Sequence, residues 1–160
     1  MIDPTLPRRS QEVQQRLHEL GVSADVQELP DSTRTAVEAA EALGCEVGAI
    51  ASSLLFLADE EPLLIMTSGA HRVDPPTVAE AIGATTVAQA TAKQVRAVTG
   101  QAIGGVAPVG HPQRIRTVVD ESLAAYETVW AAAGTPHTVM PLTFAELVAI
   151  TSGAVIAVAP

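Results

Sequence analysis

Apolar residues near the start of the chain recur every three or four positions. This spacing predicts an amphipathic helix over residues 8–20, which ends at Gly21. Thr35 is followed three residues later by a glutamate, which is the spacing of a capping box and predicts that Thr35 opens a second helix. Further helices are predicted where capping residues or following glycines mark their ends, at residues 75–83, 92–98 and 143–150.

Continuous apolar runs predict buried strands. Residues 49–58 and 63–67 are two such runs, and the acidic turn between them predicts a hairpin. Shorter strands are predicted at residues 26–29, 87–88, 115–119, 128–132, 138–141 and 154–158. The segment 128–132 is ambiguous, because residues 122–133 also support a helix. This mixture of elements predicts an α/β (α+β) fold with a largely buried mixed sheet.

Length and charge limit the partners that we expect. A chain of 160 residues, 48% of them hydrophobic, predicts one domain, here residues 10–160 preceded by a short arm, residues 1–9. The formal net charge is −9, but residues 1–61 carry twelve acidic and four basic residues, against six and five in residues 62–160. A contact with nucleic acid should therefore be small, depend on salt and come from the later part of the chain. Aromatic residues make up only 2%, which argues against a base-stacking platform.

The compartment follows from what the sequence lacks. Cys45 is the single cysteine, so no internal disulfide can form, which fits a reducing environment. The N-terminal residues show no apolar stretch of the secretory type, and the uncharged run 47–58 is too short to span a bilayer. We expect a cytoplasmic protein without a membrane partner.

A glycine-rich segment is the first candidate for chemistry. Residues 100–110 contain four glycines and a proline, so backbone N–H groups there could approach a ligand closely; a structural turn is the alternative. The segment lacks the lysine of a phosphate-binding P-loop and the spacing of a dinucleotide-binding loop. Paired cysteines, a His-Glu-x-x-His motif and a Gly-x-Ser-x-Gly elbow are also missing, so we expect neither a metal nor another cofactor.

Short motifs along the chain follow one another in the order and spacing of a known family. They are Thr33-Arg34-Thr35, Gly48 to Phe56, Gly69 to Asp74, Thr99 to Gly110, Asp120 to Leu123 and Ala133 to His137. From about residue 10 onward the chain resembles the YbaK-like family, the aminoacyl-tRNA editing domain also found within or beside prolyl-tRNA synthetases. The resemblance implies a mixed sheet curled toward a barrel with helices around it. It also implies hydrolysis of the ester that joins a wrong amino acid to the terminal adenosine of a tRNA.

The resemblance also implies site residues. Gly104 and Gly105 would offer backbone donors to a carbonyl or oxyanion, and His137 would place a water or contact the ribose. A turn on the protein surface is the alternative for His137. The residues implied in substrate binding are Ser52, Thr35, Arg72, Asp120 and Gly134. For Asp120 the alternative is a cap of the following segment, and for Arg72 a place in the entry of the next helix.

Ser52 is the main departure from the family pattern. The family usually carries a lysine there, thought to hold the aminoacyl-adenosine end, and serine replaces its fixed charge and three donors with one neutral donor. We expect substrate holding to be weaker by roughly 1.5–3 kcal/mol. One hypothesis is a trans-acting aminoacyl-tRNA deacylase that grips the acceptor end, with an aminoacyl-tRNA synthetase as a further candidate partner. The other is a weakened or inactive member that binds an aminoacyl-nucleotide-like ligand or a protein; the oligomeric state stays open.

Overall fold

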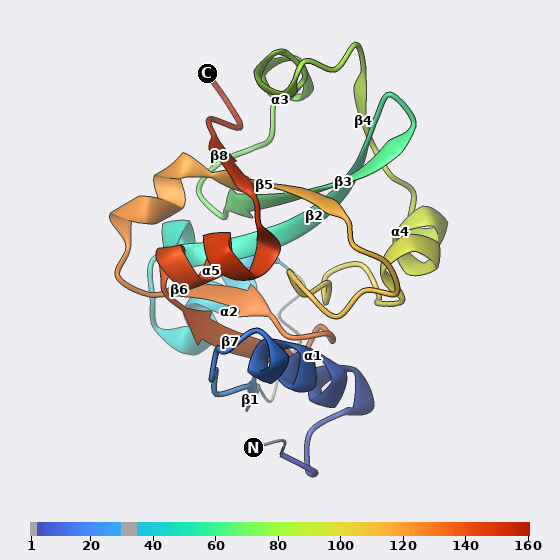
Figure 1. Ribbon diagram of the computed structural model, residues 1–160. Coiled ribbons are helices and arrows are strands. Elements are labelled where there is room, and N and C mark those ends of the chain that lie inside the picture. Colours follow the sequence, from blue (N-terminus) through green and yellow to red (C-terminus); the bar gives the residue numbers. More distant parts are fainter. Residues whose placement is uncertain (1–2, 30–34) are drawn as a thin grey trace.

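The computed structural model describes residues 3–29 and 35–160 (Figure 1). Five α-helices lie within these residues: α1 (Arg8–Glu19), α2 (Ala36–Leu43), α3 (Pro75–Ile82), α4 (Ala92–Thr99) and α5 (Phe144–Thr151). Two 3-10 helices accompany them: η1 (Val47–Ala49) and η2 (Glu121–Ala125). The strands are β1 (Gln27–Glu28), β2 (Ile50–Ala58), β3 (Glu61–Ser68), β4 (Val87–Gln89), β5 (Arg116–Asp120), β6 (Val129–Ala132), β7 (Thr138–Leu142) and β8 (Ala154–Ile156).

The strands form one mixed sheet in the order β1-β7-β6-β2-β3-β5-β8, with β4 pairing the outer part of β2. The long hairpin β2–β3 is antiparallel, whereas β6 joins β2, β5 joins β3 and β8 joins β5 in parallel. The predicted fold class is confirmed. Because β1 and β8 end the order without pairing each other, the sheet is not closed into a barrel.

Local signals explain most of the elements. Thr35, Asp74 and Thr143 each cap a helix by accepting a backbone N–H three residues later, as predicted. Thr91 caps α4 in the same way, which was not predicted. The hairpin turn places both Asp59 and Glu60 at positive φ, which is typical of a tight two-residue turn. The ambiguous segment splits into η2 and the strand β6, so the strand prediction is confirmed there.

The ends of the chain differ slightly from expectation. α1 begins at Arg8, and the division into an arm and a domain at residue 10 stays a prediction. The last strand ends at Ile156 instead of Val158. Val158 is nevertheless buried, and its carbonyl accepts the Asp74 N–H at 2.8 Å, so the tail is tied to the start of α3.

Helices cover one face of the β2–β3 hairpin only at its two ends. Alternate β2 residues share a face: Ile50 packs with α2, and Phe56 packs in a second cluster with Val78 of α3. Ser52 and Leu54 lie between these two packed ends. The opposite face of the hairpin, with Ala51 and Leu55, belongs to the main hydrophobic core.

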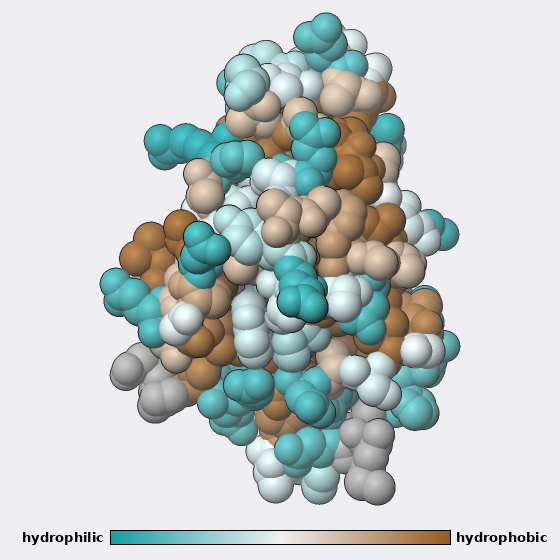
Figure 2. Space-filling view, turned by 90° about the vertical axis from the view of Figure 1, so that its left-hand side faces the viewer, coloured by the Kyte–Doolittle hydropathy of each residue, from teal (hydrophilic) through white to brown (hydrophobic). Residues whose placement is uncertain are grey.

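The surface carries no dominant apolar patch on the face shown in Figure 2, where hydrophobic side chains are interspersed with hydrophilic ones. Figure 1 places α3 and α1 at opposite ends of the molecule, with the C-terminus near α3. Among the described residues, no helix combines the length and the apolar character needed to cross a lipid bilayer.

Candidate functional site

A small pocket opens where α2 leaves the sheet face uncovered. It encloses about 150 Å³ between α2, strands β2, β6 and β7, and the glycine-rich loop. Its lining brings together three residues that the resemblance had implied, namely Thr35, Ser52 and Gly104. Most other lining groups are apolar, and no ionisable side chain contributes within the described part of the chain. The pocket therefore suits a small neutral group.

The Ser52 side chain is available to a ligand. It is half-buried on β2, and its hydroxyl has no hydrogen-bond partner among the described residues. The neighbouring Ser53 points to the opposite face and donates to the sulfur of Met66 at 3.2 Å. Thr67 lies directly across the hairpin from Ser52. This hydroxyl can therefore form a hydrogen bond with a group that enters the pocket.

The two glycines of the loop have different tasks. Gly104 lines the pocket at φ +87°, a conformation that glycine adopts readily. Gly105 already donates its N–H to the Ala102 carbonyl at 2.9 Å. A Cβ on Gly105 would lie 2.5 Å from the carbonyl carbon of Thr135. Gly105 thus permits close backbone packing, and of the two N–H groups the one on Gly104 has no partner among the described residues.

Gln101 organises this loop from inside and was missed by the sequence analysis. Its side chain is 3% exposed, and its Oε1 accepts the Ala107 N–H at 2.7 Å. Its Nε2 donates to the Gly110 carbonyl at 3.5 Å, so one amide joins distant points of the loop. A polar residue in a glycine-rich segment is usually expected to be exposed to solvent. No signal in the sequence indicates that Gln101 is buried instead.

Replacing Gln101 by leucine should lower the thermal stability of the protein. The substitution keeps the volume but leaves the buried Ala107 N–H without its acceptor, at a cost of about 1–3 kcal/mol. Gln15→Leu, at an exposed position of α1, is the matched control and should leave Tm almost unchanged. Equal Tm values for the two variants, measured by circular dichroism, would show that Gln101 does not stabilise the loop.

Besides Gly105, four implied site residues do not line the pocket. Gly134, at φ +101°, packs against the backbone of Arg9, because a Cβ on Gly134 would lie 3.0 Å from the carbonyl group of Arg9. His137 has an exposed side chain, and its backbone carbonyl accepts the Leu29 N–H at 2.8 Å. Arg72 is exposed just before α3. Asp120, the fourth, lies on the other side of β3.

Asp120 ties the ends of three segments together. It is 1% exposed at the end of β5, and its carboxylate accepts the N–H of Ser68 at 3.0 Å and that of Ser122 at 2.9 Å. His71 Nδ1 lies 3.1 Å from the same carboxylate and was not predicted as its partner. Burial alone would raise the pKa of Asp120, but these hydrogen bonds outweigh it and lower the pKa. The carboxylate also caps η2, which was the predicted alternative to substrate binding.

The lowered pKa makes folding stability depend on pH. The folded protein holds the charged carboxylate more strongly than the unfolded chain does, so stability is gained above the unfolded pKa and lost as the pH falls through the folded one. Asp120→Asn should cost about 1–3 kcal/mol at neutral pH and flatten the fall of Tm toward about pH 3. Asp25→Asn, at an exposed site, serves as control. A steep acid loss that survives in Asp120→Asn would contradict this assignment.

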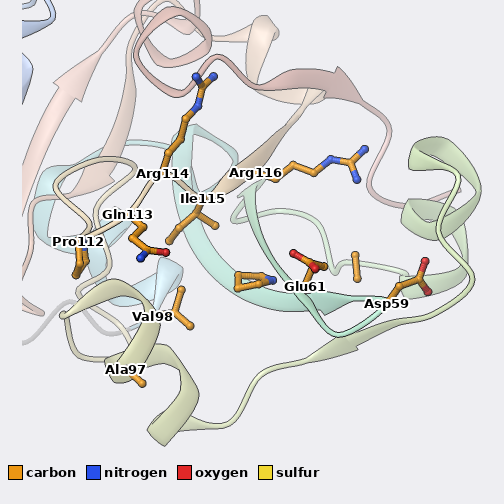
Figure 3. Close-up of a pocket in the computed structure, with 11 residues that line it drawn as sticks. Asp59, Glu61, Ala97, Val98, Pro112, Gln113, Arg114, Ile115 and Arg116 are labelled. Atoms are coloured by element: carbon orange, nitrogen blue, oxygen red, sulfur yellow. The ribbon is translucent and has the colours of Figure 1, made fainter.

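A larger groove lies at the far end of the hairpin and is lined by none of the predicted site residues (Figure 3). It has a volume of about 750 Å³, between the β2–β3 turn, α4 and the segment that enters β5. Arg114 and Arg116 extend from that segment, while Asp59 and Glu61 lie at the turn. Within residues 3–29 and 35–160 no three His, Cys, Asp or Glu side chains are grouped so as to hold a metal ion.

Comparison with known proteins identifies the family. The profile described as aminoacyl-tRNA editing domain matches residues 30–150. The YwhH protein of Bacillus subtilis (strain 168) is 32% identical over 124 residues, which cover 77% of this chain and 78% of that protein. The proline–tRNA ligase of Latilactobacillus sakei subsp. sakei (strain 23K) is 34% identical over 76 residues, which cover 48% of this chain but only 13% of the ligase.

A solved structure gives the same answer over the whole fold. It is described as a candidate trans-editing enzyme for prolyl tRNA synthetase, and it superposes with a TM-score of 0.91 at 41% identity. The match covers 98% of this chain and 99% of that one. The resemblance drawn from the motifs is confirmed, and the chain belongs to the aminoacyl-tRNA editing domain family.

Proposed function

We propose that the protein is a trans-acting deacylase that hydrolyses the ester of a mischarged tRNA. The observation that carries this proposal is the small neutral pocket, in which the unpaired Ser52 hydroxyl and the Gly104 backbone come together. Support comes from the solved structure described as a candidate trans-editing enzyme for prolyl tRNA synthetase, which this chain matches over nearly its full length. A tRNA with which prolyl-tRNA synthetase works is therefore the first candidate substrate, and the cytoplasm is the compartment we propose.

The pocket limits the amino acid. Its volume of about 150 Å³ is below the roughly 300–1,000 Å³ of sites that enclose a whole small molecule. It can take a small aminoacyl group, while the adenosine would lie outside, along the rim where Ile103 is half exposed. A charged amino-acid side chain would be left without a counter-ion there, because the described lining has none. Small neutral amino acids are therefore the proposed substrates.

The reaction needs little from the protein beyond placement. A water molecule would attack the ester carbonyl while the Gly104 N–H stabilises the developing oxyanion. The bond from the carbonyl carbon to the ribose oxygen then breaks and a proton of the water passes to that oxygen, which yields free amino acid and free tRNA. Attack by a ribose hydroxyl would only move the ester to that hydroxyl, and water would still have to complete the hydrolysis. Ser52 would bind the substrate and not attack it, because the described part of the lining has no ionisable group to take its proton. The role of His137, which would place a water or contact the ribose, stays a prediction, and His137 does not itself line the pocket.

A second candidate is a non-catalytic member of the family that binds an aminoacyl-nucleotide-like ligand or a protein. The replacement of the family's usual lysine by Ser52 favours it, since a neutral hydroxyl supplies less binding energy than a charged donor. A panel of mischarged tRNAs separates the two functions. We expect alanyl, seryl and cysteinyl esters to be hydrolysed above the spontaneous rate, and leucyl, phenylalanyl and glutamyl esters to stay intact. Hydrolysis of the bulky esters at the same rate would contradict the role of the pocket.

A further inference from the structure

We propose that the large groove beside the β2–β3 turn binds the phosphate backbone of an RNA stem, and that Arg114 and Arg116 make the contacts. The inference rests on the proposed function, because it takes the stem to be the acceptor stem of the tRNA whose end enters the small pocket. It adds a second, separate contact surface to that site. The groove is drawn in Figure 3.

Cations without ion-pair partners are concentrated around this groove. The arginines of α1 are engaged with glutamates of the same helix, as in the pair of Arg8 with Glu12 at 3.4 Å. The remaining described basic residues make no ion pair: Arg72, Lys93, Arg96, Arg114 and Arg116. Of these, Arg114 and Arg116 line the groove, and Lys93 and Arg96 belong to α4, whose Ala97 also lines it. In a chain with a net charge of −9, this part of the surface is the one that could attract an anion.

The two central arginines share one side of the chain. Arg114 and Arg116 flank the buried Ile115, and alternate residues of an extended segment point the same way. Both also line a second hollow of about 400 Å³ on the side of α5, so their side chains stand between two open spaces. An arginine head in this setting is free to form paired hydrogen bonds with a phosphate group.

Helix α4 adds positive charge on the other side of the groove. Ala97 lines the groove, and Lys93 lies one helical turn before it on the same face. Arg96 is adjacent and exposed. Their long side chains can reach the groove's edge, where they would follow a backbone that rests on Arg114 and Arg116.

Acidic residues lie at one end of the groove, in the hairpin turn. The Asp59 carboxylate accepts the N–H groups of Thr85 and Thr86, at 3.0 and 2.8 Å. These hydrogen bonds, led by that from Thr86, lower the pKa of Asp59, so it keeps its negative charge. Glu61 is the other acid in the lining, and Glu60 lies between the two in the turn. The lining therefore holds two arginines and two acids, and the positive charge that would attract a phosphate is that of the two arginine heads together with Lys93 and Arg96 of α4.

The groove lies at a useful distance from the pocket. Ser52 lines the pocket and Ala58 lines the groove, and both belong to the continuous strand β2. Six residues of extended chain span about 20 Å. A single-stranded 3′ end seated in the pocket could thus reach a stem that rests on the groove.

The test measures binding apart from hydrolysis. The probe is an uncharged RNA minihelix, an acceptor stem with its single-stranded 3′ end, titrated by fluorescence anisotropy at several salt concentrations. Arg114→Gln and Arg116→Gln should each weaken binding about three- to tenfold and lower the slope of log K against log salt by about 0.7–0.9. Arg116→Lys should keep the slope, because it keeps the charge. The control Arg8→Gln, on α1, should bind as the wild type does.

A second substrate separates this inference from the proposed function. Hydrolysis of an aminoacyl-adenosine that lacks the stem requires only the pocket, so the groove variants should cleave it at the wild-type rate. If the wild type cleaves no substrate yet the groove variants bind the minihelix more weakly, the proposed function fails and the groove stands. An unchanged salt slope in Arg114→Gln and Arg116→Gln, or a wild type that does not bind the minihelix, overturns the groove assignment.

Discussion

Gly105→Ala is expected to reduce ester hydrolysis by about a hundredfold, because it displaces the loop that carries Gly104. The added Cβ would lie 2.5 Å from the carbonyl carbon of Thr135 and 2.7 Å from the nitrogen of Pro136. Both neighbours are backbone atoms, which cannot rotate aside as the end of a side chain can. The loop must therefore move away from the 134–136 segment, at a cost of about 1–3 kcal/mol in stability. Hydrolysis rate and thermal melting are measured on the same preparation.

Gly83→Ala is the matched control for this effect. Gly83 ends α3 at φ +73° with open space around the position of a Cβ, so alanine there strains the backbone without touching the pocket. It should cost about 1 kcal/mol in stability and leave hydrolysis unchanged. If Gly105→Ala hydrolyses mischarged tRNA as fast as Gly83→Ala does, the loop does not shape the reactive site.

Ser52→Lys is expected to raise kcat/KM for at least one small mischarged tRNA by about ten- to a hundredfold. The substitution introduces the residue that the resemblance to the family leads us to expect there, and it places a fixed positive charge in a lining that otherwise has none among the described residues. Ser52→Ala removes only a hydroxyl without a partner and should lower kcat/KM by no more than about tenfold. Steady-state hydrolysis of alanyl, seryl and cysteinyl substrates measures all three proteins.

The opposite result for Ser52→Lys would also be informative. A folded variant with no gain on any of the three substrates, judged by its melting curve, would favour the non-catalytic member of the family. It would also show that a positive charge added at position 52 is not sufficient for hydrolysis.

Much of the fold could be predicted because its signals are local. A threonine followed three residues later by glutamate or glutamine favours a helix start, as at Thr35 and Thr143. The segment around Trp130 was ambiguous because its composition suits both a helix and a strand. Tertiary pairing decides it, since Trp130 lies beside Ile50 of β2 and opposite Pro141 of β7.

The site was predictable only in part, for a physical reason. The resemblance of the motifs to the family predicted that Ser52 and Gly104 belong to one site, and both line the same pocket. The motifs did not show that the Gly105 N–H already donates to the Ala102 carbonyl. The partners of Gln101 and the contact of His71 with Asp120 depend on how loops and strand ends meet. Such contacts leave no periodicity in the sequence.

The charge distribution was a similar case. The counts showed that the later part of the chain is nearly neutral, and this limited any nucleic-acid contact to a small surface there. They did not show that the segment before β5 brings Arg114 and Arg116 to one groove, which α4 with Lys93 and Arg96 borders. That grouping follows from the sheet order, which sets β5 beside β3 at the hairpin.

The central claim is that the protein is an enzyme and not only a binder, and multiple turnover tests it most directly. An excess of alanyl-tRNA is incubated with a small amount of the wild-type protein, and released alanine is counted against the spontaneous loss without protein. We predict that release continues well beyond one alanine per protein molecule. Release that stays at the spontaneous rate, with a folded protein that still binds the tRNA, would contradict the deacylase and leave the binding module.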